Sequence, residues 1–141
     1  MKKLTVIITL LSIIILSGCT TSKNISISKE IPSNVTSGKE FNFTIIVNND
    51  DTEKHELRSI DISNKFLKGI MILKTNYDIK EEYDTFWQHI FEFKKDIPIK
   101  SEIQIVFTAK AIRSGDFSGD LDICIDGDSS CLFNSIRIIV D

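Results

Sequence analysis

The stretch that decides the fold is EFNFTIIVN, residues 40–48. Its apolar side chains recur at every second position and belong to Phe41, Phe43, Ile45 and Val47. Asn42 and Thr44 lie between them, and a period of two places the two sets on opposite faces of an extended chain. The turn-forming residues 48–51, Asn-Asn-Asp-Asp, then end the pattern. The sequence therefore predicts a strand with one face in a core.

Similar short stretches occur on both sides of this strand, separated by turn residues. We predict strands over residues 25–31, 55–62, 70–73, 85–93, 103–111, 117–125 and 136–140. In the second of these the apolar positions change parity after Leu57, which predicts a β-bulge. Seven to eight short strands with turn signals about every 8–12 residues are typical of a single antiparallel β-sandwich. We expect an all-β domain over residues 25–141, with no helix longer than one turn at residues 64–69.

The N-terminus follows a different pattern. Lys2 and Lys3 precede an apolar run over residues 4–16, and polar residues follow from Thr20. A basic start followed by about 7–15 apolar residues is typical of a secretory signal peptide, whereas a membrane span needs about 20. We therefore expect a cleaved signal helix.

The end of this run, Leu16-Ser17-Gly18-Cys19, resembles the lipobox of bacterial lipoproteins at all four positions. The resemblance implies a signal peptide over 1–18, cleavage before Cys19, a diacylglyceryl group on the Cys19 sulfur, and often an acylated new N-terminus. Two or more acyl chains hold a protein stably at a membrane. The expected product is lipid-anchored on the exported side of the cell membrane or outer membrane, with a short tether over 19–24. The alternative is an ordinary signal peptide in which Cys19 lies near the cut.

Cleavage would leave one domain and change its charge. It removes two lysines and no acid, so the formal charge changes from −3 to −5. An acidic domain without a basic cluster argues against nucleic acid as a partner.

With Cys19 assigned to lipid, two cysteines remain, Cys124 and Cys131. In an oxidising compartment such a pair predicts a disulfide. A thiolate metal site is the alternative, but no further cysteine or nearby histidine completes four ligands. Because its parity is opposite to that of Ile123 and Ile125, we expect Cys124 to point away from the core.

Residues 35–49, VTSGKEFNFTIIVNN, resemble the strand entry of immunoglobulin-like domains that bacteria attach to cell-surface proteins. The resemblance is architectural and implies an immunoglobulin-like sandwich over 25–141. The hallmark of antibody domains, a tryptophan between two distant cysteines, is absent because Trp87 precedes both Cys124 and Cys131.

Two groups of residues are candidate sites. Calcium favours carboxylate oxygens, and four aspartates surround the last predicted hairpin: Asp120, Asp122, Asp126 and Asp128. Their spacing does not follow that of the EF-hand calcium loop, and Asp120 and Asp122 also fit a solvated sheet face. The second group, Tyr77, Tyr83 and Phe86, lies in or beside an acidic segment over 76–84, which we expect to be an exposed loop and a partner-binding surface. We expect Trp87 in the core and His89 half-buried and hydrogen-bonded.

The pattern of a catalytic serine elbow is missing from the sequence, and the paired acids Glu81 and Glu82 carry no pocket signature. We therefore expect no enzymatic activity and no cofactor beyond the lipid. The predicted function is an anchored binding or scaffolding module for another envelope protein or a surface glycan. The alternative is an accessory lipoprotein that binds calcium or a small ligand through residues 120–128.

Overall fold

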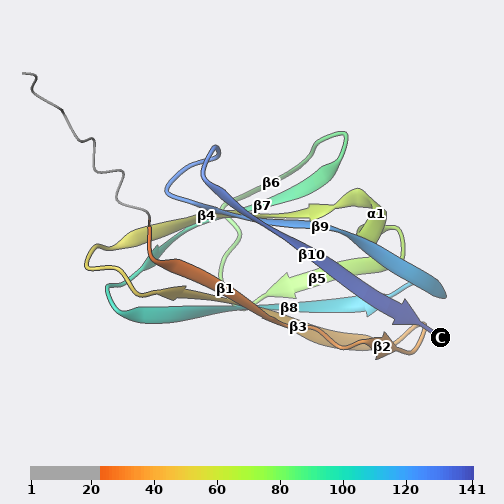
Figure 1. Cartoon of the computed structure of the whole chain (residues 1–141). Coiled ribbons are helices and arrows are strands. Elements are labelled where there is room, and N and C mark those ends of the chain that lie inside the picture. The colour runs from red at the N-terminus through yellow and green to blue at the C-terminus, as the bar shows by residue number, and fades with distance from the viewer. Residues whose placement is uncertain (1–22) are drawn as a thin grey trace, which may run out of the picture.

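The computed structural model describes residues 23–141, which form two packed β-sheets (Figure 1). The four-stranded sheet has the order β1 (Ile25–Glu30), β3 (Glu40–Asn49), β8 (Ser101–Ala111) and β5 (Ile70–Thr75). The six-stranded sheet has the order β2 (Asn34–Val35), β10 (Cys131–Val140), β9 (Gly115–Ile125), β4 (His55–Ser63), β7 (Gln88–Ile97) and β6 (Glu81–Asp84). The expected all-β sandwich is confirmed. The expected signal helix, Cys19 and most of the tether lie outside the described residues.

Two differences from the expected strands have physical reasons. Residues 81–84 form the edge strand β6 and not a loop, because they pair with β7 although all four side chains are exposed. The two-residue β2 pairs parallel with β10, so the sandwich is not wholly antiparallel. The described part of the chain thus holds ten strands. Neither short strand has the alternation that reveals a strand in sequence.

The core lies between the sheets and begins with the alternating face of β3. Phe43, Ile45 and Val47 are buried there, as expected. The ring of Phe43 stacks on Phe107 of the neighbouring β8 at 4.8 Å between centroids. Phe91 of β7 meets Phe107 edge to face, 5.7 Å away, and joins the inner faces of the two sheets. Such interdigitated inner faces are what hold a sandwich together.

The predicted bulge in the second strand is confirmed. The register of β4 shifts between Leu57 and Ser59, against both β7 and β9. Leu57 and Ile60 can therefore both face the core, where both are fully buried. On the opposite, outer face, Ser59, Asp61 and Ser63 follow one another.

Residues 70–73 were expected to be a buried strand, but β5 is an edge of the four-stranded sheet. Ile70 is buried, whereas Met71 and Leu73 are 44% and 41% exposed. Because β5 pairs with β8 alone, no strand of the described residues lies along its other edge to cover these side chains. Near it, one helical turn, α1 (Asn64–Leu67), follows β4 as expected.

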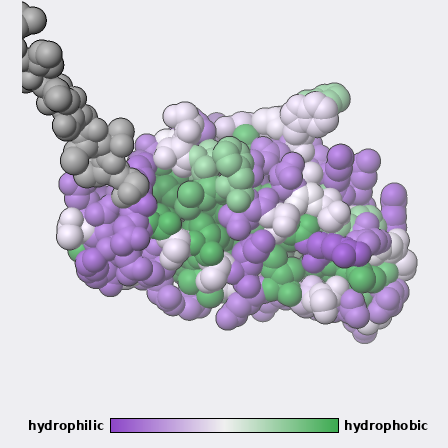
Figure 2. Space-filling view, viewed as in Figure 1, coloured by the Kyte–Doolittle hydropathy of each residue, from purple (hydrophilic) through white to green (hydrophobic). Residues whose placement is uncertain are grey.

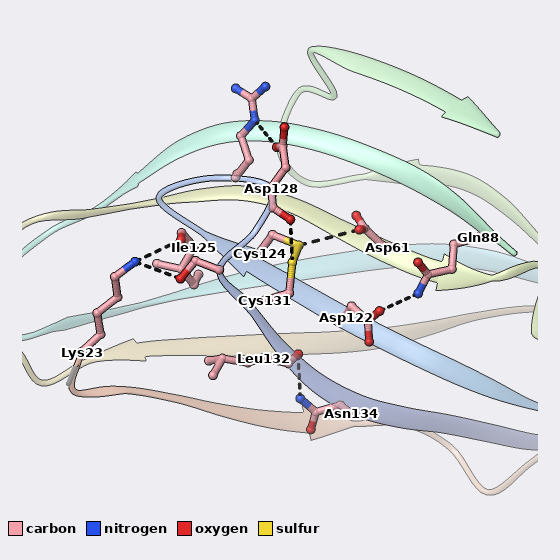
Figure 3. Close-up of a disulfide and its surroundings, with 12 residues drawn as sticks. Lys23, Asp61, Gln88, Asp122, Cys124, Ile125, Asp128, Cys131, Leu132 and Asn134 are labelled. Atoms are coloured by element: carbon pink, nitrogen blue, oxygen red, sulfur yellow. Dashed lines mark hydrogen bonds and ion pairs between the residues drawn. A yellow bond between two sulfur atoms is a disulfide. The ribbon is translucent and has the colours of Figure 1, made fainter. Parts of the chain in front are cut away.

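Cys124 and Cys131 lie directly opposite each other in the β9–β10 hairpin and form the predicted disulfide (Figure 3). Cys124 is on the outer face, as its parity predicts, yet only 1% exposed. Its sulfur lies 3.7 Å from Oδ2 of Asp61. Within residues 23–141, no helix combines the length and apolarity that crossing a membrane requires.

Candidate binding site

The turn between β6 and β7 carries two adjacent, highly exposed aromatic side chains. Phe86 is 83% exposed and Trp87 is 71% exposed, and their rings meet edge to face at 4.5 Å. The expectation that Trp87 belongs to the core is therefore wrong. Trp87 precedes the first residue of β7, so the alternation seen at His89, Phe91 and Phe93 does not extend to it. In Figure 2 the tip of the β6–β7 hairpin projects from the upper surface with pale and green side chains.

Hydrogen bonds hold this turn in one conformation. The backbone N–H of Thr85 donates to the carbonyl of Gln88, and the N–H of Gln88 donates to Oγ1 of Thr85. Asn64, at the start of α1, donates its side-chain amide to the carbonyls of Thr85 at 3.0 Å and Phe86 at 3.5 Å. Its backbone N–H donates to the carbonyl of Trp87 at 2.9 Å. The two aromatic side chains are thus presented by a fixed backbone.

A groove of about 440 Å³ separates this turn from α1 and β9. Phe86 and Trp87 line the groove from the turn, and Lys65 of α1 and Lys68, which caps the C-terminal end of α1, line it from the helical turn. Its remaining lining residues are polar or small: Ser63, Asn64, Ser118, Gly119 and Asp120. We name it the aromatic groove.

Gly119 is required for the shape of the aromatic groove. A Cβ atom at this position would lie 2.4 Å from Cβ and 2.6 Å from Oγ of Ser63. Ser63 in turn accepts a hydrogen bond from the backbone of Lys65 and caps α1. A side chain at residue 119 would therefore displace the N-cap of α1, which positions Lys65 and Lys68 in the groove.

Of the residues expected to bind a partner, only Phe86 lines the aromatic groove. Tyr83 is 42% exposed on β6, opposite Ile90 and on the outer face of the sheet. Tyr77 is partly buried against the core, and the Lys95 ammonium lies 4.6 Å above its ring. The three aromatic residues therefore do not form one surface. The contribution of α1 could not be predicted from the sequence, because α1 touches the turn only after folding.

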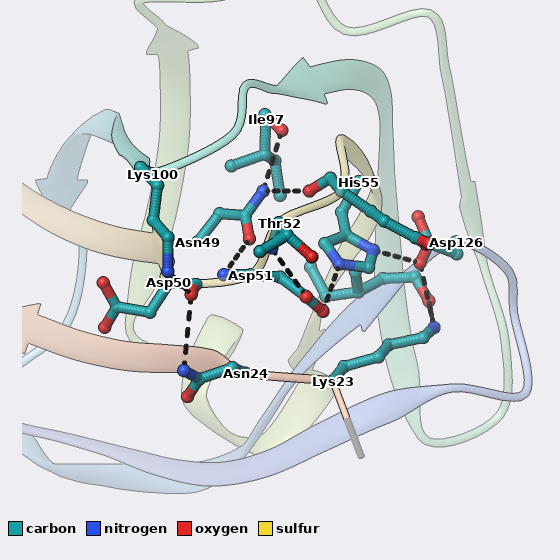
Figure 4. Close-up of polar contacts among 12 residues, drawn as sticks. Lys23, Asn24, Asn49, Asp50, Asp51, Thr52, His55, Ile97, Lys100 and Asp126 are labelled. Atoms are coloured by element: carbon teal, nitrogen blue, oxygen red, sulfur yellow. Dashed lines mark hydrogen bonds and ion pairs between the residues drawn. The ribbon is translucent and has the colours of Figure 1, made fainter. Parts of the chain in front are cut away.

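A second polar cluster lies at the opposite end of the sheet, where the chain enters the domain (Figure 4). His55, only 6% exposed, contacts Oδ2 of Asp126 through Nδ1 at 2.7 Å and Oδ2 of Asp51 through Nε2 at 3.1 Å. Lys23 pairs with the same oxygen of Asp126 at 3.0 Å and donates to the carbonyl of Ile125. We name these four charged residues the tether cluster. It binds the last part of the expected tether to the β9–β10 hairpin.

The titration of the tether cluster follows from these contacts. Burial on its own would lower the pKa of His55, but the hydrogen bonds to Asp126 and then to Asp51 outweigh burial and raise it. The hydrogen bond from His55 is the largest cause that lowers the pKa of Asp51. Burial would raise the pKa of Asp126, yet the hydrogen bonds from the Glu56 backbone, His55 and Lys23 lower it. The cluster thus favours a charged histidine between two carboxylates.

The four aspartates that were considered for calcium have separate surroundings. Asp126 belongs to the tether cluster, and Asp128 pairs with Arg58 at 3.0 Å. Asp122 accepts a hydrogen bond from Gln88 at 2.7 Å, and Asp120 lines the aromatic groove (Figure 3 shows Asp122 and Asp128). No group of three or more His, Cys, Asp or Glu side chains suited to a metal ion occurs within residues 23–141.

Two acids are buried on the outer face of the six-stranded sheet, which the sequence did not suggest. Asp61 is 9% exposed, and its Oδ1 has no hydrogen-bond partner among the described residues. Burial is the largest cause that raises the pKa of its carboxyl. Glu92 is 4% exposed and contacts the ammonium of Lys94 at 3.1 Å and the guanidinium of Arg58 at 3.4 Å. Asp61 is thus the less well paired of the two.

His89 is half-buried and hydrogen-bonded, as expected: its Nδ1 lies 2.9 Å from Asp84 and its Nε2 lies 3.7 Å from Glu82. It lines an apolar cleft of about 300 Å³ between β5 and β7, together with Glu82. The rest of the lining is hydrocarbon or thioether: Leu67, Ile70, Met71, Ile72, Phe91 and Ile112. The cleft thus pairs one histidine and one carboxylate with walls that carry no nucleophilic hydroxyl or thiol.

No protein-family model and no curated protein sequence matches the chain. Among solved structures, PapD-like domain 7 of human CEP192 has a TM-score of 0.52 at 9% identity, covering 100% of this chain and 97% of that one. AvmM, which catalyses macrocyclization in alchivemycin A biosynthesis, has a TM-score of 0.51 at 11% identity, covering 83% and 89%. Spo0M, a sporulation control protein from Bacillus subtilis, has a TM-score of 0.50 at 17% identity. The match covers 83% of this chain and about half, 49%, of Spo0M. At these identities the likeness is one of fold, and the chain forms an immunoglobulin-like β-sandwich.

Proposed function

We propose that this protein is a lipid-anchored envelope lipoprotein whose immunoglobulin-like domain is a binding or scaffolding module. Its partner is another envelope protein or a surface glycan, and the aromatic groove is the surface that contacts it. The anchor is the diacylglyceryl group that the lipobox predicts on Cys19. Binding, and no chemical step, is the activity of the domain.

The observation that carries the proposal is the exposure of Phe86 and Trp87 on a hydrogen-bonded turn. When either side chain stays in water, the fold lacks the roughly 1.5–3 kcal/mol of free energy that burial of a large apolar side chain contributes. Exposed tryptophan is typical of binding hot spots, and a fixed backbone reduces the entropy that a partner must overcome. Folding alone does not account for two such rings side by side at the tip of a hairpin.

The position of the aromatic groove also supports the proposal. Lys23, where the expected tether reaches the domain, contacts Ile125 at the end of β9, whereas the groove is lined by Ser118 and Gly119 near the start of that strand. Gly119 and Ile125 are six positions apart, which is about 20 Å along a strand. In Figure 1 the chain accordingly enters at one end of the sandwich, and α1 lies at the other. An anchor on Cys19 would leave the groove free to face away from the membrane.

Affinity capture from solubilised envelope, with the anchored protein as bait, tests the proposed surface. The double substitution Phe86→Ala with Trp87→Ala should abolish capture of the partner while the protein remains folded. Phe133→Ala is the matched control, because Phe133 is 80% exposed on β10 but does not line the aromatic groove. Equal capture by the double variant and the wild type would refute the groove as the contact surface.

The anchor is tested separately. Cys19→Ser should stop metabolic lipid labelling and leave unprocessed precursor in the membrane. A mature, soluble Cys19→Ser protein would instead show that an ordinary signal peptidase makes the cut.

A further inference from the structure

We propose that the aromatic groove takes an anionic saccharide, a sugar that carries a carboxylate or phosphate group. This inference rests on the proposed function and narrows its partner to one chemical class. It follows from three properties of the groove: its aromatic side, its lysine side and its position on the domain.

The aromatic side fits a sugar ring. A pyranose has apolar C–H faces and a rim of hydroxyls, so it packs flat on an aromatic ring and hydrogen-bonds at its edge. Phe86 and Trp87 supply the apolar surface, and Ser63, Ser118 and Asp120 supply hydroxyl and carboxylate groups in the same groove. Its volume, about 440 Å³, lies in the range of roughly 300–1,000 Å³ common for small-ligand sites.

The lysine side determines the charge of the ligand. Lys65 and Lys68 are exposed, and neither has an ion-pair partner within residues 23–141. Residues three apart in a helical turn lie on the same side, so both ammonium groups can reach one anion. Against them the groove has a single acid, Asp120, on a chain of net charge −3. This local excess of positive charge complements an anionic ligand.

An anionic membrane surface would also attract lysines beside tryptophan and phenylalanine. Two observations favour a saccharide. Besides the aromatic rings, the groove is lined by Ser63, Ser118 and Asp120, whose polar groups can pair with the hydroxyls of a sugar but would lose their water at a membrane surface. The groove also lies at the end of the domain opposite to Lys23, through which the expected anchor is attached.

A matched pair of disaccharides tests the inference: cellobiose and cellobiouronic acid, which differ by one carboxylate. Trp87 is the only tryptophan in the chain, so its fluorescence reports directly on the groove. We expect saturable quenching or a blue shift with both sugars. The acid should bind about fivefold to tenfold more tightly at low salt, and this advantage should shrink as salt rises.

The double substitution Lys65→Ala with Lys68→Ala should remove the preference for the acid, so that the two sugars bind the variant with the same affinity. Lys39→Ala with Lys74→Ala is the control, since both lysines are exposed and lie outside the groove. Equal affinity of the wild type for the two sugars would overturn the inference, as would an absence of binding to either. Blue-shifted binding to phosphatidylglycerol vesicles without sugar binding would identify a membrane surface and overturn it too. Capture of an envelope protein that depends on Trp87, without sugar binding, would leave the proposed function standing and refute only the saccharide.

Discussion

The two ends of the six-stranded sheet use polar and aromatic side chains in opposite ways. At the tether cluster, His55 is buried and each charged group faces an opposite charge. At the aromatic groove, two rings are exposed and two lysines have no ion-pair partner in the described part of the chain. A satisfied cluster stabilises a fold, whereas exposed apolar surface and free charge are available to a ligand. The first end therefore stabilises the fold, and the second is the surface that we propose for binding.

The largest effect on stability is expected from the disulfide beside the tether cluster. Cys124→Ala with Cys131→Ala should lower the free energy of unfolding by about 2.5 kcal/mol, because the bond closes a loop of about eight residues. Urea unfolding of the oxidised wild type and the variant measures the loss. Disaccharide binding at the other end should be unchanged in the folded variant, and a parallel loss would show that the two ends are coupled.

The next largest effect is expected from His55→Ala, at about 1–2 kcal/mol, because the variant loses a buried group hydrogen-bonded to Asp126. The loss should depend on pH. The pKa of folded His55 lies above its ordinary 6.5, so its stabilisation is complete below pH 6.5 and fades as the pH rises through the raised value. The pKa values of Asp51 and Asp126 lie below the ordinary 3.8, so their contribution is present above 3.8 and is lost as the pH falls through the lowered values.

Unfolding free energies of the wild type and His55→Ala should therefore differ most between about pH 4 and 6.5. Phe133→Ala, at an exposed position away from the tether cluster, controls for the effect of truncation. A pH-independent difference would mean that His55 acts through packing and not through its charge.

Asp61 lies between the two ends of the sheet and is a third case, because it is buried without a full set of hydrogen-bond partners. Its folded pKa is raised above 3.8, so its effect on stability becomes unfavourable as the pH rises through the raised value. Asp61→Asn should therefore raise the free energy of unfolding at pH 7 by about 1 kcal/mol. Thermal melts at pH 4 and pH 7 test this, and a variant less stable than the wild type at pH 7 would contradict it.

Asn64→Ala should cost about 1 kcal/mol, since it removes the side-chain bonds to Thr85 and Phe86. Its effect on binding should be greater than its effect on stability, because the turn loses the bonds that orient Phe86 and Trp87. Fluorescence titration with cellobiouronic acid measures the first effect and urea unfolding the second. Unchanged affinity would show that the turn does not need Asn64 to hold its shape.

The smallest effect on stability is expected at the exposed Trp87. Trp87→Ala should change the free energy of unfolding by less than about 0.5 kcal/mol, as for other surface positions. Urea unfolding followed by circular dichroism measures it without the tryptophan signal. A loss of 2 kcal/mol or more would return Trp87 to a structural role and remove the contrast between the two ends.

The predicted features that were confirmed depend on neighbours in sequence. The face of β3, the bulge after Leu57 and the pairing of Cys124 with Cys131 all follow from short-range alternation or spacing. The prediction failed for Trp87, because the alternation of β7 was extended to a residue that precedes the strand. It also failed for residues 81–84, whose strand conformation comes from pairing with β7.

The candidate site was predictable only in part. Phe86 was identified because aromatic residues near an acidic loop are typical of a binding surface, and Tyr77 was included for the same reason although it packs against the core. The roles of Lys65 and Asn64 could not be inferred, because they reach the groove from a helical turn about twenty residues earlier in the chain. The partners of His55 come from residues 51 and 126, and no local pattern connects those two.

The sequence by itself determined that residues 25–141 form a β-sandwich, because a period of two in apolar residues is a local property of an extended chain. It also determined the disulfide and predicted a lipid anchor at Cys19. Only the tertiary structure decided which rings lie in water and which charges meet, because both depend on what packs opposite a residue. Burial made His55 part of the tether cluster, and the absence of a covering layer within residues 23–141 made Phe86 and Trp87 one side of the aromatic groove.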